Sequence, residues 1–329
     1  MAFSFNFDVH LETGDCPEET DMIQGDHSLQ DLESKPRQPD NPTQDSVKEA
    51  QEHSPPLNCQ PLLENTVCET FSLGSLPPIH YLNESVLEQT ASERPDKEKI
   101  LSQTVASHSD LISGVYEGGL RIWECTFDLL EYVESHGVTF AGKRVLDLGC
   151  GAGLLGILAL KSGAQEVHFQ DYNSTVIEEL TLPNVVLNCE DEEEEDEKGE
   201  NTSSSPKGAT KSSLQAGLAR CRFFSGDWES FLPLVLSSDP PPQYDFILTS
   251  ETIYNTAYYP ALHNVFHKLL SPEGLVYLAT KAHYFGVGGG LHLFQSFVEK
   301  ANIFDIKCLA DVEQGLRRHV VALSFKKTE

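Results

Sequence analysis

The sequence has few basic residues, no long apolar run and few cysteines. Lysine and arginine number 23 against 51 acidic residues in 329, so the formal net charge is −28. This balance excludes a basic nucleic-acid-binding face as the main feature of the chain. No apolar run reaches the ~18 residues of a membrane-spanning helix, and residues 1–8 lack the features of a secretory signal. We expect an intracellular protein without membrane contact or direct contact with nucleic acid.

The eight cysteines show none of the short paired spacings that zinc sites use. Most of them stand among apolar neighbours, and a free cysteine is commonly buried. We therefore expect reduced, partly buried thiols, with no disulfide framework and no metal site.

The negative charge is concentrated in two parts of the chain. Residues 1–107 hold 20 acidic and 6 basic side chains, giving −14, and residues 190–200 hold 9 and 1, giving −8. Ten of the 18 prolines also lie within the first 100 residues. Such segments bury too little apolar surface to offset the entropy of ordering. We predict a mostly disordered acidic tail over 1–104 and a folded domain over 105–329, interrupted by a disordered acidic insertion at 190–219.

Two features of these acidic parts stay open. Phe3, Phe5 and Phe7 alternate with polar residues, as on a strand with one apolar face. They could dock on a sheet edge or a partner, or belong to an idle tail end. The insertion is either an interaction segment or a solvated loop, and we favour the loop.

From Ser107 onward, short apolar runs alternate with helical patterns, which indicates repeated βα units. Five buried strands are predicted at 144–148, 166–170, 221–225, 244–249 and 274–280. Helices are predicted between and after them at 154–161, 175–187, 228–236, 258–270 and 291–301. Two final strands, 304–310 and 318–325, flank a tight connection that favours an antiparallel hairpin. The predicted fold class is α/β, a Rossmann-like doubly wound sheet of seven strands.

The first strand ends in a glycine-rich loop that is typical of a ligand site. Gly149, Gly151 and Gly153 allow a sharp turn and a close approach of the backbone to a ligand, and a helix follows at once. Gly151, Gly153 and Gly156 also match the spacing of a dinucleotide fingerprint, which by itself is a weak indication.

Two acidic residues at strand ends favour a ligand with a cationic centre over a dinucleotide. Asp147 ends the first strand, where a carboxylate would oppose a pyrophosphate and favour a cationic centre. The second strand ends in Gln170-Asp171-Tyr172-Asn173, and Asp171 stands near the spacing at which an acid meets ribose hydroxyls. A nucleoside beside a positive centre points to S-adenosyl-L-methionine.

Both tryptophans of the chain lie near the same predicted edge. Trp228 follows Gly226 and Asp227 at the end of the third strand, where an acid and a flat ring could frame an adenine. Trp123 stands just ahead of the predicted sheet. Each tryptophan taken alone could equally be a packing residue.

At this point the motifs resemble a known family. The run DLGCGAG at 147–153 resembles the glycine motif of seven-β-strand S-adenosylmethionine-dependent methyltransferases, and the likeness extends over roughly residues 105–326. The segment SHSDLISGVYEGGLRIWECTFDLL at 107–130 and the segment KAHYFGVGGGLHLF at 281–294 are similar to those of eukaryotic protein-histidine N-methyltransferases. The stretch SETIYN, which ends at Asn255, resembles the acid-x-x-Tyr motif of the subgroup that methylates protein side chains.

The resemblance implies a set of cofactor-binding residues, a target and a location. The implied cofactor residues are Ile122, Trp123, Glu124, Cys125, Thr126, Gly149, Gln170, Asp171, Tyr172, Gly226, Asp227, Trp228 and Ser250. To these the strand-end argument adds Asp147, Gly151 and Asn173. The implied target is a histidine in a large-subunit ribosomal protein, methylated on the ring nitrogen remote from the backbone (the tele position). Cytoplasm and nucleus are the implied compartments, with the nucleolus as a third, although the basic cluster of the family's insertion is reduced here to Lys198, Lys207 and Lys211.

Methyl transfer to histidine needs positioning more than it needs a strong base. Neutral imidazole has a free lone pair, since its unperturbed pKa is about 6.5. An acceptor for the other ring N–H would stabilise the developing imidazolium. Our hypothesis assigns this role to Glu251 or Asn255, with Tyr254 as a wall of the acceptor pocket; a Glu251 that only braces its loop is the alternative. The glycine-rich loop 286–290 is expected at the mouth of the substrate site.

Three other functions stay open at this point. A protein-lysine methyltransferase shares the acid-x-x-Tyr motif, an NAD-dependent oxidoreductase shares the glycine spacing, and a non-catalytic adaptor could keep the fold. A monomer is expected because no coiled-coil repeat is present.

Overall fold

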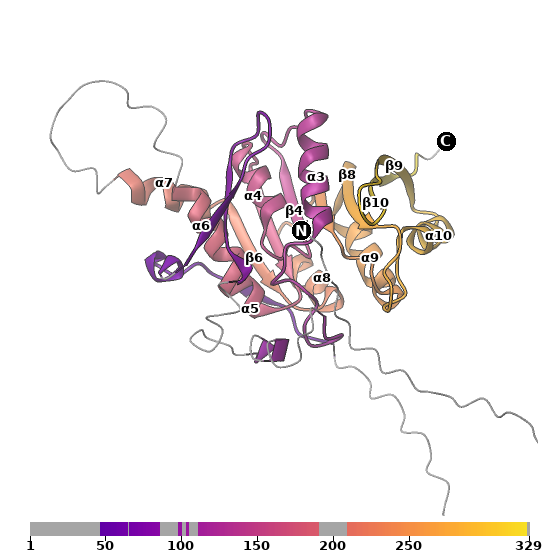
Figure 1. Cartoon of the computed structure of the whole chain (residues 1–329), viewed down its shortest axis with the longest axis horizontal. Coiled ribbons are helices and arrows are strands. Elements are labelled where there is room, and N and C mark those ends of the chain that lie inside the picture. The colour runs from indigo at the N-terminus through magenta and orange to yellow at the C-terminus, as the bar shows by residue number, and fades with distance from the viewer. Residues whose placement is uncertain are drawn as a thin grey trace, which may run out of the picture.

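The computed structural model describes residues 47–64, 66–85, 98–100, 103–104, 111–190 and 209–327. A sheet of eight strands forms the centre of these residues, in the order β1-β6-β5-β4-β7-β8-β10-β9 (Figure 1). The strands of this sheet are β1 (Gln51–His53), β4 (Arg144–Leu148), β5 (Glu166–Asp171), β6 (Cys221–Ser225), β7 (Tyr244–Ser250), β8 (Leu270–Lys281), β9 (Phe304–Val312) and β10 (Arg318–Phe325). A separate pair consists of β2 (Cys68–Phe71) and β3 (Ile79–Leu82).

The pairing of the strands confirms the predicted doubly wound α/β fold. β4 pairs in parallel with β5 and β7, β5 with β6, and β7 with β8. β10 is antiparallel to both β8 and β9, so the last two strands form the predicted hairpin. The strand order reverses between β4 and β7, and a ligand crevice is expected beside the carboxyl ends at such a point.

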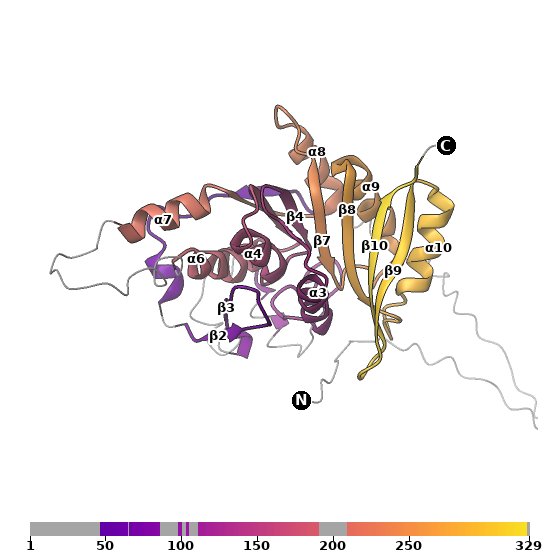
Figure 2. The ribbon, with the colours of Figure 1, turned by 90° about the horizontal axis from the view of Figure 1, so that it is seen from above.

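Helices cover both faces of the sheet (Figure 2). They are α3 (Glu124–Ser135), α4 (Leu154–Lys161), α5 (Ser174–Val176), α6 (Leu182–Glu190), α7 (Ala209–Leu218), α8 (Trp228–Leu236), α9 (Tyr259–Leu269) and α10 (Leu291–Ala301), with short helical turns at Gln60–Leu63, Ile177–Thr181 and Thr256–Tyr258. Consecutive residues of β4 show why its run is continuously apolar: Val145 packs into the core below α3, α4 and α6, whereas Leu146 packs into the core below α8 and α9.

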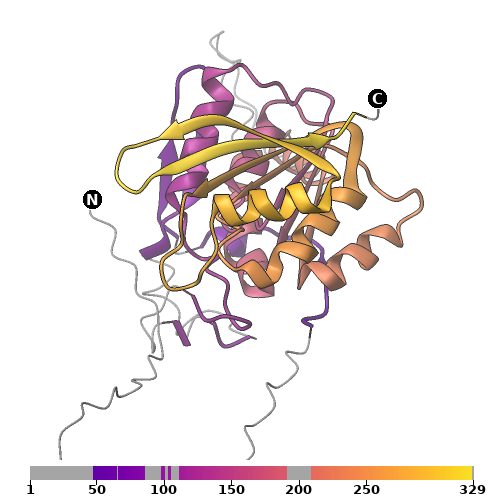
Figure 3. The same cartoon turned by 90° about the vertical axis from the view of Figure 1, so that its right-hand side faces the viewer.

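The predicted helix 175–187 is divided in the structure. A π-helical turn at Ile177–Thr181 separates α5 from α6, and α6 continues to Glu190. β8 begins at Leu270, four residues before the predicted start, because its first residue pairs with Tyr244 of β7. Figure 3 shows α10 lying against the β9–β10 hairpin at this end of the sheet.

The prediction of a mostly disordered tail over 1–104 is wrong for residues 47–64 and 66–85. β1 adds an eighth strand to the predicted seven, and β3 docks on α6. The docking uses side-chain amides: the backbone N–H of Leu82 donates to Asn184 Oδ1 at 2.8 Å, and that of His80 to Asn188 Oδ1 at 3.0 Å. These partners lie a hundred residues away in sequence, so no local pattern indicates them. Phe3, Phe5 and Phe7 lie outside the described residues.

The predicted disordered insertion at 190–219 is likewise wrong over 209–218, which form α7. Leu214 and Leu218 pack against the core, and a Cβ at Gly217 would lie 2.6 Å from Cys189 Sγ. This close contact holds α7 on the end of α6. Lys198 and Lys207 lie outside the described residues.

Two further findings concern the described residues only. None of their helices is long and apolar enough to cross a membrane. No disulfide joins the seven cysteines among them.

Candidate active site

A cavity of about 380 Å³ opens at the carboxyl ends of the parallel strands. Its lining comes from the loops after β4, β5, β6 and β7, from residues within 114–126 and from Val47. The topological switch point between β4 and β7 therefore carries the site, as the strand order requires.

Most of the predicted site residues meet at this cavity. Those that line it are Ile122, Trp123, Thr126, Gly149, Gly151, Asp171, Tyr172, Gly226, Asp227, Trp228, Ser250, Glu251 and Tyr254. The lining also includes residues that no sequence pattern singled out, among them Glu117, Gly118, Gly119, Arg121, Thr252 and Tyr258. Five of these six lie within the segments 107–130 and 250–255 that carry the family resemblance, although they were not named as site residues, and Tyr258 lies three residues beyond the second segment.

The glycine loop approaches neighbouring segments so closely that a side chain at Gly149 or Gly151 would collide with them. Gly149 and Gly151 have φ of +65° and +49°. A Cβ at Gly149 would lie 2.5 Å from Thr252 Cγ2, and a Cβ at Gly151 would lie 3.0 Å from the carbonyl oxygen of Gly119. Gly156 has a different role, because its Cβ would lie 2.3 Å from the Phe169 ring. The third glycine of the dinucleotide spacing therefore serves the packing of α4 on β5.

Asp147 does not line the cavity, and the prediction that it selects a cationic ligand is wrong. The residue is 1% exposed, and its Oδ2 accepts a hydrogen bond of 2.8 Å from the N–H of Gly156. α4 begins after Gly153, which offers no capping side chain, so Asp147 satisfies an N–H of the first turn from the neighbouring strand. Burial raises the pKa of its carboxyl to about 8.

Asp171 does line the cavity, as predicted. Its carboxylate accepts hydrogen bonds from the N–H groups of Gly151 at 2.9 Å and Asn173 at 3.3 Å. Burial raises the pKa of this carboxyl to about 6, although these backbone bonds oppose the rise. At neutral pH Asp171 is thus predominantly ionised at the point where the glycine loop meets the end of β5.

The charge around the cavity is mostly negative. The Asp, Glu, Lys and Arg residues of its lining are the acids Glu117, Asp171, Asp227, Glu229 and Glu251 and the base Arg121, and of these acids Glu251 is paired with Lys281. This excess of carboxyl groups disfavours a pyrophosphate and favours a cationic ligand.

Several predicted residues support the cavity from behind. Gln170 accepts a hydrogen bond from Trp228 Nε1 and donates one to the carbonyl of Gly226, both at 2.9 Å. Asn173 donates to the carbonyl of Val115 at 2.9 Å. Gln170 thus joins the end of β5 to the loop after β6, and Asn173 joins the loop after β5 to the segment ahead of α3; neither residue lines the cavity.

Glu124, Cys125 and Asn255 also lie outside the lining. Cys125 is fully buried, and burial followed by the nearby negative charge of Glu251 raises the pKa of its thiol well above the usual value. Asn255 caps the turn Thr256–Tyr258, because its Oδ1 accepts a hydrogen bond of 3.0 Å from the N–H of Ala257. The prediction that Asn255 is an acceptor for substrate in the pocket is therefore wrong.

Glu251 lines the cavity, but its carboxylate is paired with a buried lysine. Lys281 Nζ lies 3.2 Å from Glu251 Oε1, and the two residues are 3% and 8% exposed. The same ammonium group lies 5.1 Å from the centre of the Trp123 ring. Glu251 has a φ of +59°, so the loop after β7 adopts a backbone conformation that is rare for this residue type.

A second acid of the lining, Glu117, accepts hydrogen bonds from two tyrosines that also line the cavity. Tyr254 donates a hydrogen bond from its hydroxyl to Glu117, and the hydroxyl of Tyr258 donates to Glu117 Oε1 at 3.0 Å. The N–H of Gly114 also donates to this oxygen, at 2.6 Å. Burial, followed by the charge of Glu117, raises the pKa of Tyr254 well above its usual value. Tyr254 therefore stays protonated.

These features fit S-adenosylmethionine as the group that the cavity holds. The backbone of the glycine loop lines the cavity, the lining is rich in carboxylates, and both tryptophans line the cavity. Asp171, Asp227, Trp228 and Tyr172 would hold its nucleoside end.

Comparison with known proteins agrees with this assignment. A family described as "Methyltransferase domain" matches residues 127–310, more than half of the chain. The fold and the cavity thus define an S-adenosylmethionine-dependent methyltransferase.

The individual relatives point to a narrower family within this class. A histidine protein methyltransferase 1 homolog of Bos taurus is 53% identical over 282 residues, covering 85% of this chain and 74% of the relative. The homolog of Dictyostelium discoideum is 38% identical over 233 residues, covering 70% and 64%. EEF1A lysine methyltransferase 3 of Mus musculus is 29% identical over 161 residues, covering 49% and 55%. The chain belongs to the histidine protein methyltransferase 1 family, so neither an NAD-dependent oxidoreductase nor a non-catalytic adaptor describes it.

Proposed function

We propose that this enzyme methylates the tele nitrogen of a histidine in a protein substrate, and that the substrate is a large-subunit ribosomal protein. The observation that carries the histidine assignment is the similarity to relatives named histidine protein methyltransferase 1 homolog. The Tyr254–Glu117 pair on the cavity wall supports it, because it offers an acceptor that fits an imidazole N–H.

The Tyr254 hydroxyl has the properties of an acceptor for an imidazole N–H. Its proton is committed to Glu117, so its lone pairs are available to a second donor. A histidine ring that donates to Tyr254 through one nitrogen presents the lone pair of the other nitrogen. Tyr254 thereby fixes the tautomer and the orientation of the ring.

Glu117 contributes a negative charge behind this hydroxyl. S-adenosylmethionine, when bound, supplies a methyl group on a sulfonium centre, and positive charge moves to the imidazole as the methyl is transferred. The carboxylate of Glu117, reached through Tyr254, stabilises this imidazolium. The rings of Tyr254 and Tyr258 meet edge to face, with centroids 6.0 Å apart, and form an aromatic wall for a flat acceptor.

The role of Glu251 follows from its pairing with Lys281. A carboxylate already held by a buried ammonium group braces the loop after β7 and places Tyr254 at the cavity wall. Glu251→Gln should therefore change stability more than turnover of the folded enzyme. A loss of turnover with unchanged cofactor affinity would instead show that Glu251 takes part in methyl transfer.

The target is tested by locating the added methyl group. Purified enzyme is incubated with isotope-labelled cofactor and large-subunit ribosomal proteins, and the product is analysed by fragmentation mass spectrometry. We expect a single methyl on one histidine. A methylated lysine would support the EEF1A-type alternative, and an unmodified ribosomal pool would refute the substrate.

The pH dependence separates histidine from lysine independently. A histidine acceptor loses its proton near its unperturbed pKa of about 6.5, so the rate should level off above about pH 7.5. A lysine acceptor has an unperturbed pKa of about 10.4, so the rate should keep rising to about pH 9.

The remaining parts of the proposal concern the setting of the reaction. We propose that the enzyme acts as a monomer in the cytoplasm and the nucleus, the nucleolus included, without direct contact with nucleic acid. Imaging of the tagged chain and light scattering test these statements.

A further inference from the structure

The segment that runs into β1 crosses the end of the sheet beside the cavity. We call residues 47–53 the amino-terminal arm. It lies well before the family match at 127–310, yet Val47 belongs to the cavity lining. We propose that this arm is part of the cofactor site, and that Lys48 is a positioning residue for the nucleoside end of S-adenosylmethionine. This inference concerns cofactor binding and is independent of the target side chain.

The arm is built onto the strand that carries Gly226 and Asp227. β1 pairs antiparallel with β6, with Gln51 opposite Ser225 and His53 opposite Phe223. A Cβ at Gly226 would lie 2.5 Å from the Cα of Ala50, so only glycine allows this approach. The loop after β6 therefore has the arm as its immediate outer neighbour.

The backbone of Lys48 fixes the start of α8. Its carbonyl accepts hydrogen bonds from the N–H of Asp227 at 3.1 Å and from the hydroxyl of Ser230 at 2.6 Å. Asp227 lines the cavity, and its own side chain caps α8 by accepting from the N–H of Glu229. The arm thus determines the position of an acid that is expected to face the adenine.

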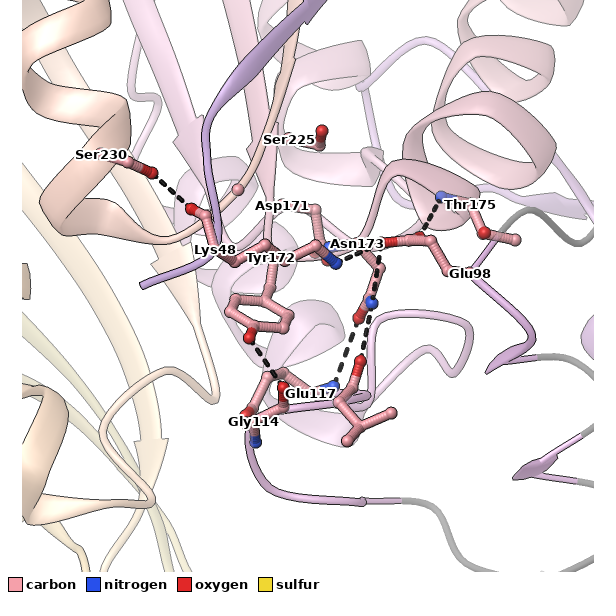
Figure 4. A network of polar contacts seen from close by, with 12 residues as sticks. Lys48, Glu98, Gly114, Glu117, Asp171, Tyr172, Asn173, Thr175, Ser225 and Ser230 are labelled. Carbon is pink, nitrogen blue, oxygen red and sulfur yellow. Dashed lines mark hydrogen bonds and ion pairs between the residues drawn. The ribbon is translucent and has the colours of Figure 1, made fainter. Parts of the chain in front are cut away.

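The side chain of Lys48 fixes the loop after β5. Its ammonium group lies 4.5 Å from the centre of the Tyr172 ring and forms an ion pair with Glu98 (Figure 4). The Tyr172 hydroxyl donates to the carbonyl of Gly114 at 2.9 Å. Tyr172 is therefore held from both ends, its ring by Lys48 and its hydroxyl by the segment that carries Glu117.

Glu98 connects this pair to the rest of the β5 loop. It accepts a hydrogen bond from the N–H of Thr175 at 2.7 Å and lies 3.5 Å from Asn173 Nδ2. Burial alone would raise the pKa of Glu98, but the bonds from Lys48 and the Thr175 N–H hold it below its usual value. Removing the Lys48 charge leaves the partly buried Glu98 carboxylate without its cationic partner beside the cofactor cavity.

The consequence is a specific effect on cofactor affinity. Tyr172 and Asp227 come from neighbouring strands, and Lys48 contacts both loops. Without its ammonium group the Tyr172 ring loses its ion contact and Glu98 its ion pair, so the nucleoside subsite is no longer preformed. Tyr254, the proposed partner of the acceptor histidine, donates its hydrogen bond to Glu117, which lies outside the arm.

Lys48→Met tests the proposal, because methionine keeps an unbranched stem and removes the charge. We expect the dissociation constant of S-adenosylhomocysteine, measured by calorimetry on the full chain, to rise about tenfold. The KM for S-adenosylmethionine should rise in proportion, whereas kcat at saturating cofactor should stay within about twofold.

Lys143→Met is the matched control. Lys143 forms an ion pair with Asp245 at 3.4 Å, near the amino-terminal ends of β4 and β7 and away from the cavity lining. The control should leave the dissociation constant within about twofold of wild type. Equal weakening of binding by both variants would overturn the proposal, as would unchanged affinity in Lys48→Met.

A double-mutant cycle tests the path through Glu98. Glu98→Gln keeps the size and the acceptor of the side chain but removes the charge. If Lys48 acts in part through this carboxylate, Lys48→Met combined with Glu98→Gln should weaken binding less than the product of the two single effects. Fully independent effects would overturn this path.

Discussion

At the scale of single residues, the carboxyl groups of the site differ in ionisation because they differ in burial and in their partners. Asp147 is sealed below the glycine loop with one backbone hydrogen bond, and burial raises its pKa to about 8. Asp171 has more backbone donors and a pKa of about 6. Both acids end adjacent parallel strands, so position in the sequence alone does not distinguish the structural carboxyl from the cavity carboxylate.

The raised pKa of Asp147 makes a prediction about stability. The folded pKa of about 8 exceeds the ordinary value of 3.8, so the unfolded chain releases the proton first as pH rises. Wild-type stability should therefore fall relative to Asp147→Asn between about pH 4 and pH 8, by at most about 1.4 kcal/mol for each pH unit. Urea unfolding at pH 4.5, 6 and 7.5 measures the difference; a constant difference would show that Asp147 is ionised in the fold.

The hydrogen bond from Tyr254 to Glu117 predicts a selective loss of turnover. Tyr254→Phe should lower kcat by about a hundredfold, since it removes the acceptor for the imidazole N–H. Glu117→Gln should lower it less, because an amide oxygen still orients the hydroxyl. In both variants the affinity for S-adenosylhomocysteine should stay within about twofold of wild type. A parallel loss of cofactor affinity would assign the pair to cofactor binding instead.

At the scale of elements, the βα units are regular because each is specified by its own residues. The helices 154–161, 228–236 and 291–301 have the predicted bounds, as have the strands 144–148 and 221–225. Local apolar runs and turn residues were sufficient for them. β1 and β3 escaped prediction because they are short and depend on partners far along the chain, such as the Asn184 and Asn188 amides that hold β3. α7 escaped prediction because it directly follows the acidic, serine-rich run and packs on the end of α6.

The close contact of α4 with β5 predicts that a methyl group added at Gly156 destabilises the fold. Gly156→Ala would place a Cβ 2.3 Å from the Phe169 ring, so we expect a loss of about 1–3 kcal/mol in the free energy of unfolding. The higher helix propensity of alanine offsets up to about 1 kcal/mol of this loss. In the double variant with Phe169→Leu the two losses should be less than additive. Additive losses in urea unfolding would mean that the ring is not the obstacle.

At the scale of the whole molecule, one edge of the sheet collects segments that lie between residues 47 and 261. Residues 47, 114–126, 149–154, 171–172, 226–229 and 250–261 contribute to the cavity. The reversal of strand order beside β4 creates the opening, and the segments ahead of the sheet fold back over it. The cofactor site is thus a property of the complete molecule.

Because distant segments of the chain form the cofactor site together, we predict that ligand binding raises the thermal stability of the fold. S-adenosylhomocysteine at about 100 times its dissociation constant should stabilise the fold by about 2.7 kcal/mol and raise Tm by roughly 5–10 °C. NAD should leave Tm within about 1 °C, since a pyrophosphate is disfavoured by the carboxylates of the lining. Differential scanning fluorimetry compares the two ligands. An equal rise with NAD would contradict the charge argument.

The sequence by itself determined the parallel βα units, the glycine loop and most of the residues at the strand ends, because periodicity and turn chemistry act over a few neighbouring residues. Only the tertiary structure decided which way each side chain points and what covers the cavity. Asp147 turns inward because an N–H of α4 needs an acceptor, and Glu117 reaches Tyr254 because a loop ahead of α3 folds over the sheet. The arm joins the cofactor site because β6 leaves an edge that β1 can pair with. Such contacts depend on where distant segments meet in space.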